Sequence, residues 1–146
     1  MGSRDYRISV KGVVVDSQGR FLLAKNSTDS NHNGEWELLG GGVEHEEHPI
    51  DALKREVFEE TGLRITEISR TPIYFITAKK NKDDKYIANI VYEIRLNSLK
   101  FIPSEECIEL RFFNKEETQN EPLFEITKKF IEAFSPSLHN NDLLAC

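Results

Sequence analysis

The distribution of apolar and polar residues along the chain predicts several short strands. Segments rich in β-branched and other apolar residues, bounded by turn residues, are typical of strands. Such segments cover residues 7–15, 21–25, 65–78, 86–96 and 109–113, and the apolar pattern also resumes at 36–39. We expect the first two segments to pair as a hairpin across a DSQG turn, and the next two to pair across the charged turn 79–85.

A helix is predicted in the first half of the chain. Ile50, Leu53 and Val57 recur at helical spacing within a run from Pro49, which suits the first helical position, to Thr61. The glycine that follows supplies a C-terminal stop. We therefore expect one helix with an apolar face toward the core and a polar face beside it.

A second, amphipathic helix is predicted at residues 123–134. Its apolar positions are Phe124, Ile126, Phe130, Ile131 and Phe134. The polar, turn-rich segment 26–34 is expected to be an exposed loop, and the tail from Ser135 is expected to be loose.

Sequential strands combined with only two helices favour an α/β fold with a mixed, largely antiparallel sheet. The chain has 146 residues, without an internal repeat or a low-complexity linker, and this length fits one domain. We expect a single domain over residues 1–146, with loose ends at 1–6 and 136–146.

Composition and charge narrow the classes of partner. The net charge is −6, without a Lys/Arg cluster that would bind polymeric nucleic acid. No apolar run approaches the roughly 18 residues that span a membrane. Cys107 and Cys146 cannot form a disulfide framework, so we expect reduced thiols in a cytoplasmic protein. Whether the chain pairs as a homodimer stays open.

Three glutamates crowd one face of the first predicted helix. Glu56, Glu59 and Glu60 are spaced i, i+3 and i+4, so their carboxylates repel one another and oppose the helix dipole. A hard cation would relieve this repulsion, and clustered carboxylates suit Mg²⁺ or Mn²⁺. The alternative is a solvated acidic surface that binds no ligand.

The residues around these glutamates decide between the two interpretations. The run GGVEHEEHPIDALKREVFEETGL, from Gly41 to Leu63, fills the pattern G-x5-E-x7-R-E-U-x-E-E-x-G-U, where U is a bulky apolar residue. This run resembles the signature of the Nudix hydrolases, a family that includes MutT-like enzymes. The resemblance implies an α/β/α sandwich and a metal-dependent hydrolase that cleaves the diphosphate linkage of a nucleotide-like substrate.

The resemblance also implies metal ligands. Glu56, Glu59 and Glu60 are expected to hold Mg²⁺ or Mn²⁺, with the Gly40 carbonyl as a further ligand, and Glu56 and Glu59 are expected to be catalytic. The glycines allow a close approach of the backbone to the substrate, most of all at Gly41.

Support for these groups is expected from a charged pair. By the resemblance, Glu47 accepts a charge-assisted hydrogen bond from Arg55, whose planar guanidinium holds the loop and the helix in register. Lys25, at the end of the second predicted strand, is placed where some family members contact phosphate.

The general base is left open. Glu56 and Glu59 are candidates, and so are Glu105, Glu106 and Glu109, which a later loop would bring to the site. Trp36 and Tyr74 are expected in the core rather than against a base, because a single aromatic residue in a strand is usually buried.

Two positions depart from the family pattern. Leu39 stands where proline is usual, and Glu46 stands where glycine is usual. If that glycine has a positive φ, Glu46 carries a strain of about 1 kcal/mol, or else the turn has a different shape.

The substrate is less constrained than the reaction. Residues 78–81 lack the Pro or Tyr found there in subfamilies that act on ADP-ribose or diadenosine polyphosphates. This favours a nucleoside triphosphate, including an oxidised one, over a nucleotide sugar or ADP-ribose. The alternatives of another class are a non-catalytic nucleotide-sensing domain and an acidic interaction domain.

Overall fold

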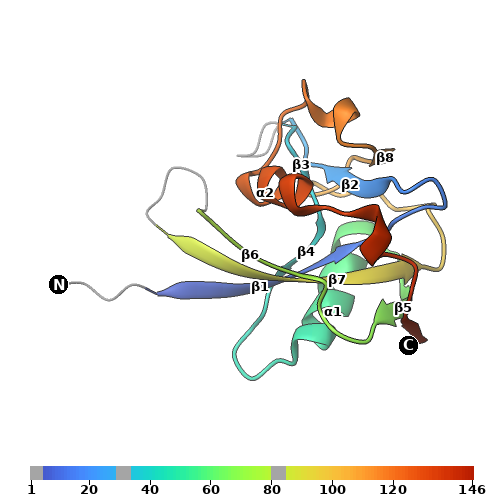
Figure 1. Cartoon of the computed structure of the whole chain (residues 1–146). Helices are drawn as coiled ribbons and strands as arrows, with labels where there is room; N and C mark the ends of the chain where they lie inside the picture. The colour runs from blue at the N-terminus through green and yellow to red at the C-terminus, as the bar shows by residue number, and fades with distance from the viewer. Residues whose placement is uncertain (1–4, 29–33, 80–84) are drawn as a thin grey trace.

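Residues 5–28, 34–79 and 85–146 are described by a computed structural model of the chain (Figure 1). Within these ranges the strands are β1 (Tyr6–Val13), β2 (Phe21–Lys25), β3 (Trp36–Glu37), β4 (Leu39–Gly42), β5 (Ile65–Ser69), β6 (Tyr74–Lys79), β7 (Tyr86–Leu96), β8 (Glu109–Phe113) and β9 (Leu143–Ala145). The helices are α1 (Pro49–Thr61) and α2 (Glu125–Ala133), with short 3-10 helices η1 (Glu116–Thr118) and η2 (Pro136–Leu138). Neither α-helix in these ranges has the length and apolar character needed to cross a membrane.

Most strands belong to one mixed sheet. Its order is β4-β1-β7-β5-β9, and β6 also pairs with β7. β1 and β7 run parallel, whereas the other neighbours in this sheet are antiparallel. The shorter strands β3, β2 and β8 form a second, antiparallel sheet. The predicted α/β fold with a mixed, largely antiparallel sheet is confirmed.

The two helices cover opposite faces of the strands (Figure 1). On one side, α1 packs against a core that includes Ala52, Leu53, Val57, Val10 and Leu39. On the other side, α2 packs against a core that includes Ile126, Phe130, Phe134, Val13, Phe21, Trp36 and Tyr74. Because side chains alternate along a strand, Val10 of β1 faces α1, whereas Lys11 and Val13 face the side of α2. This alternation decides which residues of β1 reach the functional site.

The prediction that the first two strands pair as a hairpin is wrong, because only one isolated bridge joins them. Val15 and Phe21 form that bridge, but β1 pairs with β4 and β7, while β2 pairs with β3 and β8. Both faces of β2 are buried, with Leu22 in the core of α1 and Leu23 in the core of α2. A strand buried on both faces forms the centre of a sheet, and here it is the central strand of the smaller one.

The continuous strand predicted at 65–78 is divided into β5 and β6. The hydroxyl of Ser69 donates to the Thr71 carbonyl at 2.8 Å and accepts from the Glu93 N–H at 3.1 Å. Such local hydrogen bonds compete with strand pairing and turn the chain. Both strands still pair with β7, as the predicted hairpin requires. The predicted turn 79–85 and loop 26–34 include residues outside the described ranges.

The tail, which the sequence predicts to be loose, is ordered from η2 to β9. β9 pairs with β5, and His139 is buried. The Tyr74 hydroxyl lies 2.7 Å from His139 Nε2, and His139 Nδ1 lies 3.4 Å from a Glu93 carboxylate oxygen. The Asn140 N–H donates to both oxygens of Glu93, at 3.1 and 3.0 Å. One buried polar cluster therefore attaches the tail to the sheet.

We predict that protonation of His139 in acid lowers the free energy of unfolding. Burial lowers the pKa of His139 to about 4, while an unfolded chain keeps a value near ~6.5. The unfolded state therefore binds more protons between these values, and this contribution to stability is lost as the pH falls from about 6.5 toward 4. Burial raises the pKa of Glu93, which acts with the opposite sign. We expect His139→Gln to reduce the slope of unfolding free energy against pH, measured by urea denaturation.

The matched control for this experiment is His45→Gln, because His45 is exposed in the loop before α1. That variant should keep the slope of the parent protein. An identical slope in the parent and in His139→Gln between pH ~6.5 and ~4 would rule out His139 as the source of acid sensitivity.

Candidate functional site

Helix α1 carries the acidic residues, and its two ends are fixed by local contacts. At the start, His48 Nδ1 accepts a hydrogen bond from the Ile50 N–H at 3.1 Å, directly before Pro49. At the end, Gly62 adopts a φ of 72° and donates its N–H to the Phe58 carbonyl at 2.8 Å. The helix spans the predicted residues, so the spacing of its glutamates is preserved.

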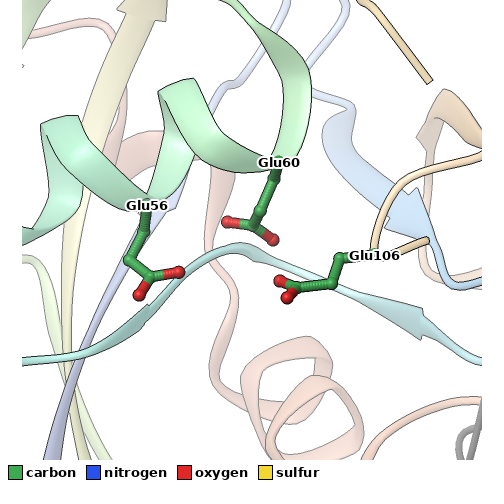
Figure 2. A group of neighbouring side chains, drawn as sticks. All are labelled: Glu56, Glu60 and Glu106. Carbon is green, nitrogen blue, oxygen red and sulfur yellow. The ribbon is translucent and has the colours of Figure 1, made fainter. Parts of the chain in front are cut away.

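Three carboxylates meet between α1, β4 and the loop before β8 (Figure 2). Glu56 and Glu60 lie one turn apart on α1, and Glu106 reaches them from the loop. An oxygen from each carboxylate lies within 4.8 Å of the other two. Carboxylates this close repel unless a proton or a cation lies among them.

Glu60 is the buried member of this cluster, with 5% of its surface exposed. Its carboxylate accepts the Gly40 N–H at 2.9 Å. Burial raises the pKa of Glu60 well above its ordinary value, and the negative charge of Glu37 adds to this. Burial likewise raises the pKa of Glu106, with a further contribution from Glu56. These groups are therefore harder to ionise than carboxylates in water.

Lys11 is a site residue that the sequence pattern does not predict. It is buried on β1 and forms an ion pair with Glu37. It also donates to the Gly40 carbonyl at 3.2 Å. Burial alone would lower the pKa of Lys11, but the charges of Glu37 and Glu60 outweigh it and raise that pKa. A buried ammonium thus partly balances the acidic cluster from beneath β4.

The glycines of β4 let the backbone pass close to its neighbours. Gly40 has a φ of 124°, and a Cβ there would lie 2.1 Å from the Val10 carbonyl oxygen. A Cβ at Gly41 would lie 2.6 Å from the carboxyl carbon of Glu56. The Ser9 hydroxyl donates to the Gly41 carbonyl at 3.1 Å. A side chain at Gly40 would collide with the backbone of β1, and one at Gly41 would displace the Glu56 carboxylate.

Arg55 connects the loop before α1 to the acidic face of the helix. Its guanidinium makes a two-pronged ion pair with Glu47, with both N···O distances at 2.9 Å. It also donates to the Gly42 carbonyl at 3.1 Å and to Glu56 at 2.9 Å, and it lies 3.4 Å from Glu59. The hydrogen bonds from Arg55 hold the pKa of Glu47 down at about 2. These contacts agree with the supporting role expected for Arg55 and Glu47.

The loop keeps its turn at the unusual Glu46. The Glu47 N–H donates to the Glu44 carbonyl at 3.0 Å, and Glu46 takes a φ of 65° within this turn. A side chain in this left-handed region costs about 1 kcal/mol. The other departure, Leu39, is buried in the core beside α1. The chain therefore keeps a turn suited to glycine and accepts the strain at Glu46.

A cavity of about 440 Å³ opens beside the carboxylates, toward α2. Its lining includes Arg7, Ser9, Lys11, Asn26, Glu37, Gly40, Gly41, Gly42, Glu56, Ala78, Lys79, Ile87, Asn89, Glu105, Glu106, Phe124, Glu125 and Ile126. Of the residues predicted for the site, Gly40, Gly41, Glu56, Glu105 and Glu106 line this cavity. Glu60 is not part of this lining.

Other predicted residues lie outside this lining. Glu59 is more than half exposed, and its carboxylate faces Arg55. The Lys25 ammonium lies over the ring of Trp36, 5.8 Å from the centroid. Glu109 pairs with Arg111 at 2.9 Å. Contacts with the substrate or the metal at Glu59, Lys25 and Glu109 stay predictions.

The aromatic residues and the cysteine next to the site have structural surroundings. Trp36 is fully buried and Tyr74 nearly so, as expected for core residues. Cys107 is buried and free, and burial raises the pKa of its thiol to about 12. The thiol stays protonated at neutral pH, so it is not poised as a nucleophile.

Comparison with known proteins places this site in a family. A sequence profile of the NUDIX domain matches residues 5–134. The chain belongs to the Nudix family. The solved structure of the MutT protein from Methanosarcina mazei Go1 has a TM-score of 0.76 at 27% identity, over 96% of this chain and 100% of that one. The fold and the signature around α1 are therefore those of a Nudix protein.

Named relatives match only part of their own length. An RNA pyrophosphohydrolase of Bartonella henselae is 32% identical over 75 residues, which is 48% of this chain and 43% of that protein. A CTP pyrophosphohydrolase of Escherichia coli K12 is 39% identical over 59 residues, 40% of this chain and 44% of that protein. This Nudix chain thus matches less than half the length of each relative.

The packing of Gly41 against Glu56 predicts that a single methyl group disrupts the acidic cluster. Gly41→Ala would place a Cβ 2.6 Å from the Glu56 carboxyl carbon, so this carboxylate must move. Displacing a ligand or its support costs about 10- to 100-fold in metal affinity. We expect Gly41→Ala to weaken Mn²⁺ binding by at least ~tenfold, measured by calorimetry.

Gly42→Ala is the matched control. A Cβ at Gly42 meets only the end of the Arg7 side chain, at 3.6 Å, which is ordinary contact. The control should bind Mn²⁺ as the parent protein does. Equal affinity in the two alanine variants would mean that Glu56 is not part of a metal site.

Proposed function

We propose that this Nudix protein hydrolyses the anhydride bond between the α- and β-phosphates of a nucleoside triphosphate, releasing a nucleoside monophosphate and pyrophosphate. The observation that carries this proposal is the convergence of Glu56, Glu60 and Glu106 at the side of a cavity of about 440 Å³. Cavities of this size accept small molecules rather than folded polymers.

The donor set suits Mg²⁺ or Mn²⁺. Hard divalent cations take carboxylate oxygens. Burial raises the pKa of Glu60, and a cation beside this carboxylate would favour its ionised form. We assign Glu56 and Glu60 as ligands. Glu59 stays a predicted third ligand from the same helix. A bound divalent ion would neutralise phosphate oxygens and lower the pKa of water.

Side chains of the protein are assigned the roles of general base, phosphate binding and structural support. Glu106 comes from a separate loop, and its raised pKa suits a general base that accepts a proton from the attacking water. Arg7 and Lys79 also line the cavity and bring positive charge to it, which favours binding of phosphates. Arg55 and Glu47 hold the loop and α1 in place around these groups.

Two observations favour a nucleoside triphosphate as the substrate. One relative is a CTP pyrophosphohydrolase, and another is an RNA pyrophosphohydrolase. With a net charge of −6 and no basic cluster in the sequence, the chain is poorly suited to a long polyanion. We therefore favour the free nucleotide, with nucleotide sugars and ADP-ribose as alternative substrates.

The proposal predicts different losses at two glutamates. With Mg²⁺, we expect the parent protein to convert CTP into CMP and pyrophosphate. The reaction is monitored by ³¹P NMR. Removing a metal ligand or a general base costs roughly 10²- to 10⁴-fold in kcat, so Glu56→Gln and Glu106→Gln should both be slow. Only Glu56→Gln should also weaken Mn²⁺ binding, measured by calorimetry.

The exposed Glu132 of α2 provides the control, because Glu132→Gln makes the same change outside the cavity. If Glu106→Gln also loses Mn²⁺ affinity, Glu106 is a ligand and its assignment as the base fails. If no triphosphate, nucleotide sugar or dinucleotide is hydrolysed, the enzymatic proposal fails. Nucleotide binding without turnover would then support the nucleotide-sensing alternative.

A further inference from the structure

Asn89 is a buried amide in the cavity lining that the proposed reaction does not use. It lies on β7, is 2% exposed, and pairs in register with Ser9 of β1. Its Nδ2 lies 3.1 Å from the Ile76 carbonyl oxygen and 3.3 Å from the Ile87 carbonyl oxygen. Because a carbonyl accepts only from a donor, these two contacts fix which end of the amide is nitrogen.

The other end of this amide is an acceptor without a partner. Among the residues that the structure describes, none donates to Asn89 Oδ1. Unlike Nδ1 of His139, this oxygen is not sealed in the interior, because Asn89 lines the cavity. This oxygen is therefore accessible to water or to a ligand in the cavity. A donor on a bound ligand would satisfy it.

Ser9 places a second acceptor beside the first. Its hydroxyl proton is used in the hydrogen bond to the Gly41 carbonyl, so its lone pairs face the remaining space as acceptors. Ser9 and Asn89 are neighbours on the parallel strands β1 and β7, and both line the cavity. The strand floor of the cavity therefore offers two fixed acceptors.

The surroundings of these acceptors suit a flat ring. Ala78, Ile87, Phe124 and Ile126 contribute apolar surface to the same cavity. Ligand sites commonly combine apolar walls with a few fixed polar groups that set orientation. The same cavity also contains Glu56, so one nucleotide can extend from the acceptors to the carboxylates.

We propose, building on the function proposed above, that Asn89 and Ser9 bind the nucleobase and select bases with an amino group at position 4 of a pyrimidine or position 6 of a purine. The amino group of cytosine or adenine donates a hydrogen bond to these acceptors. Uracil and hypoxanthine present a carbonyl oxygen at the corresponding position, which faces the acceptors with like partial charge. With the wrong base, the carbonyl oxygen of the base and the acceptors of Asn89 and Ser9 are all left without a donor. This loss of hydrogen bonds is the source of the selection.

Two pairs of substrates compare these two kinds of base edge. CTP and UTP differ at position 4 of the ring, and ATP and ITP differ at position 6, each by an amino group against a carbonyl. In each pair the adjacent ring nitrogen also changes, from an acceptor to an N–H donor. A well-placed polar contact discriminates between bases by roughly 10- to 100-fold. We expect the parent protein to show a kcat/KM ratio of at least ~10 for CTP over UTP and for ATP over ITP.

Variants of Asn89 and Ser9 test whether these side chains are the source of that ratio. Asn89→Leu keeps a similar size and removes one of the two acceptors, so the ratio for each pair should fall toward one. Ser9→Ala is a smaller change and should lower the ratio in the same direction. Ser69→Ala, which removes buried hydrogen bonds away from the cavity, should keep the ratio of the parent.

A purely structural role for Asn89 predicts a different result. Loss of packing lowers kcat/KM for both members of a pair equally and leaves their ratio unchanged. A parent protein that treats CTP and UTP alike, or variants that keep the parent's ratio, would overturn the proposal. Comparing CTP with dCTP adds a further test: if Asn89→Leu changes only that ratio, Asn89 contacts the ribose instead of the base.

Binding of the monophosphates separates this inference from the reaction itself. CMP and UMP need no turnover, and their affinities are measured by calorimetry in the parent and in Asn89→Leu. Tighter binding of CMP by the parent alone, without hydrolysis of any triphosphate, would reject the enzymatic proposal and support base selection. Equal affinities for CMP and UMP, together with hydrolysis of a triphosphate, would support the enzymatic proposal and reject base selection.

Discussion

The burial of the Glu60 carboxylate beneath β4 is the constraint on which this site depends. A carboxylate taken out of water loses its hydrogen bonds to water. The Gly40 N–H and the nearby Lys11 ammonium compensate for only part of that loss. Glu56 and Glu106 add negative charge within 4.8 Å. A proton or a further cation among these carboxylates would relieve their repulsion. This explains how a chain of net charge −6 can accept an anionic substrate, because the charge deficit lies where the phosphates would bind.

The same constraint accounts for the unusual backbone around the cluster. Glu60 reaches the Gly40 N–H because β4 passes close to α1, and a Cβ at Gly41 would meet the Glu56 carboxylate of that helix. A Cβ at Gly40 would instead meet the backbone of β1 at Val10 and Lys11. Arg55 then fixes the loop that follows by binding Glu47 and the Gly42 carbonyl. The strain at Glu46 is tolerated within this framework, since several strong contacts on either side define the path of the loop.

The parts of the structure that the sequence predicts are those set by local spacing. The bounds of α1 and the grouping of Glu56 with Glu60 follow from helical periodicity and terminal residues. Lys11 could not be selected, because in the sequence it is one polar residue in an apolar strand, and its role arises from pairing with Gly40. The partners of β2 and the burial of His139 likewise depend on contacts between distant segments. The sequence also cannot choose Glu106 over Glu105 and Glu109 as the loop carboxylate nearest the site, because that choice depends on how the loop folds back onto α1.

The position of β1 links the chemistry of the site to its recognition of a substrate. Ser9 and Lys11 are two residues apart on one face of this strand, so both point toward the cavity. β1 lies between β4, which holds the glycines, and β7, which holds Asn89. The proposed base contact of Ser9 and the charge balance provided by Lys11 are therefore built on one strand, which preserves the distance between them. A different base preference can then evolve at Asn89 without disturbing Lys11, because the two side chains share a strand pair but no hydrogen bond among those of the described residues.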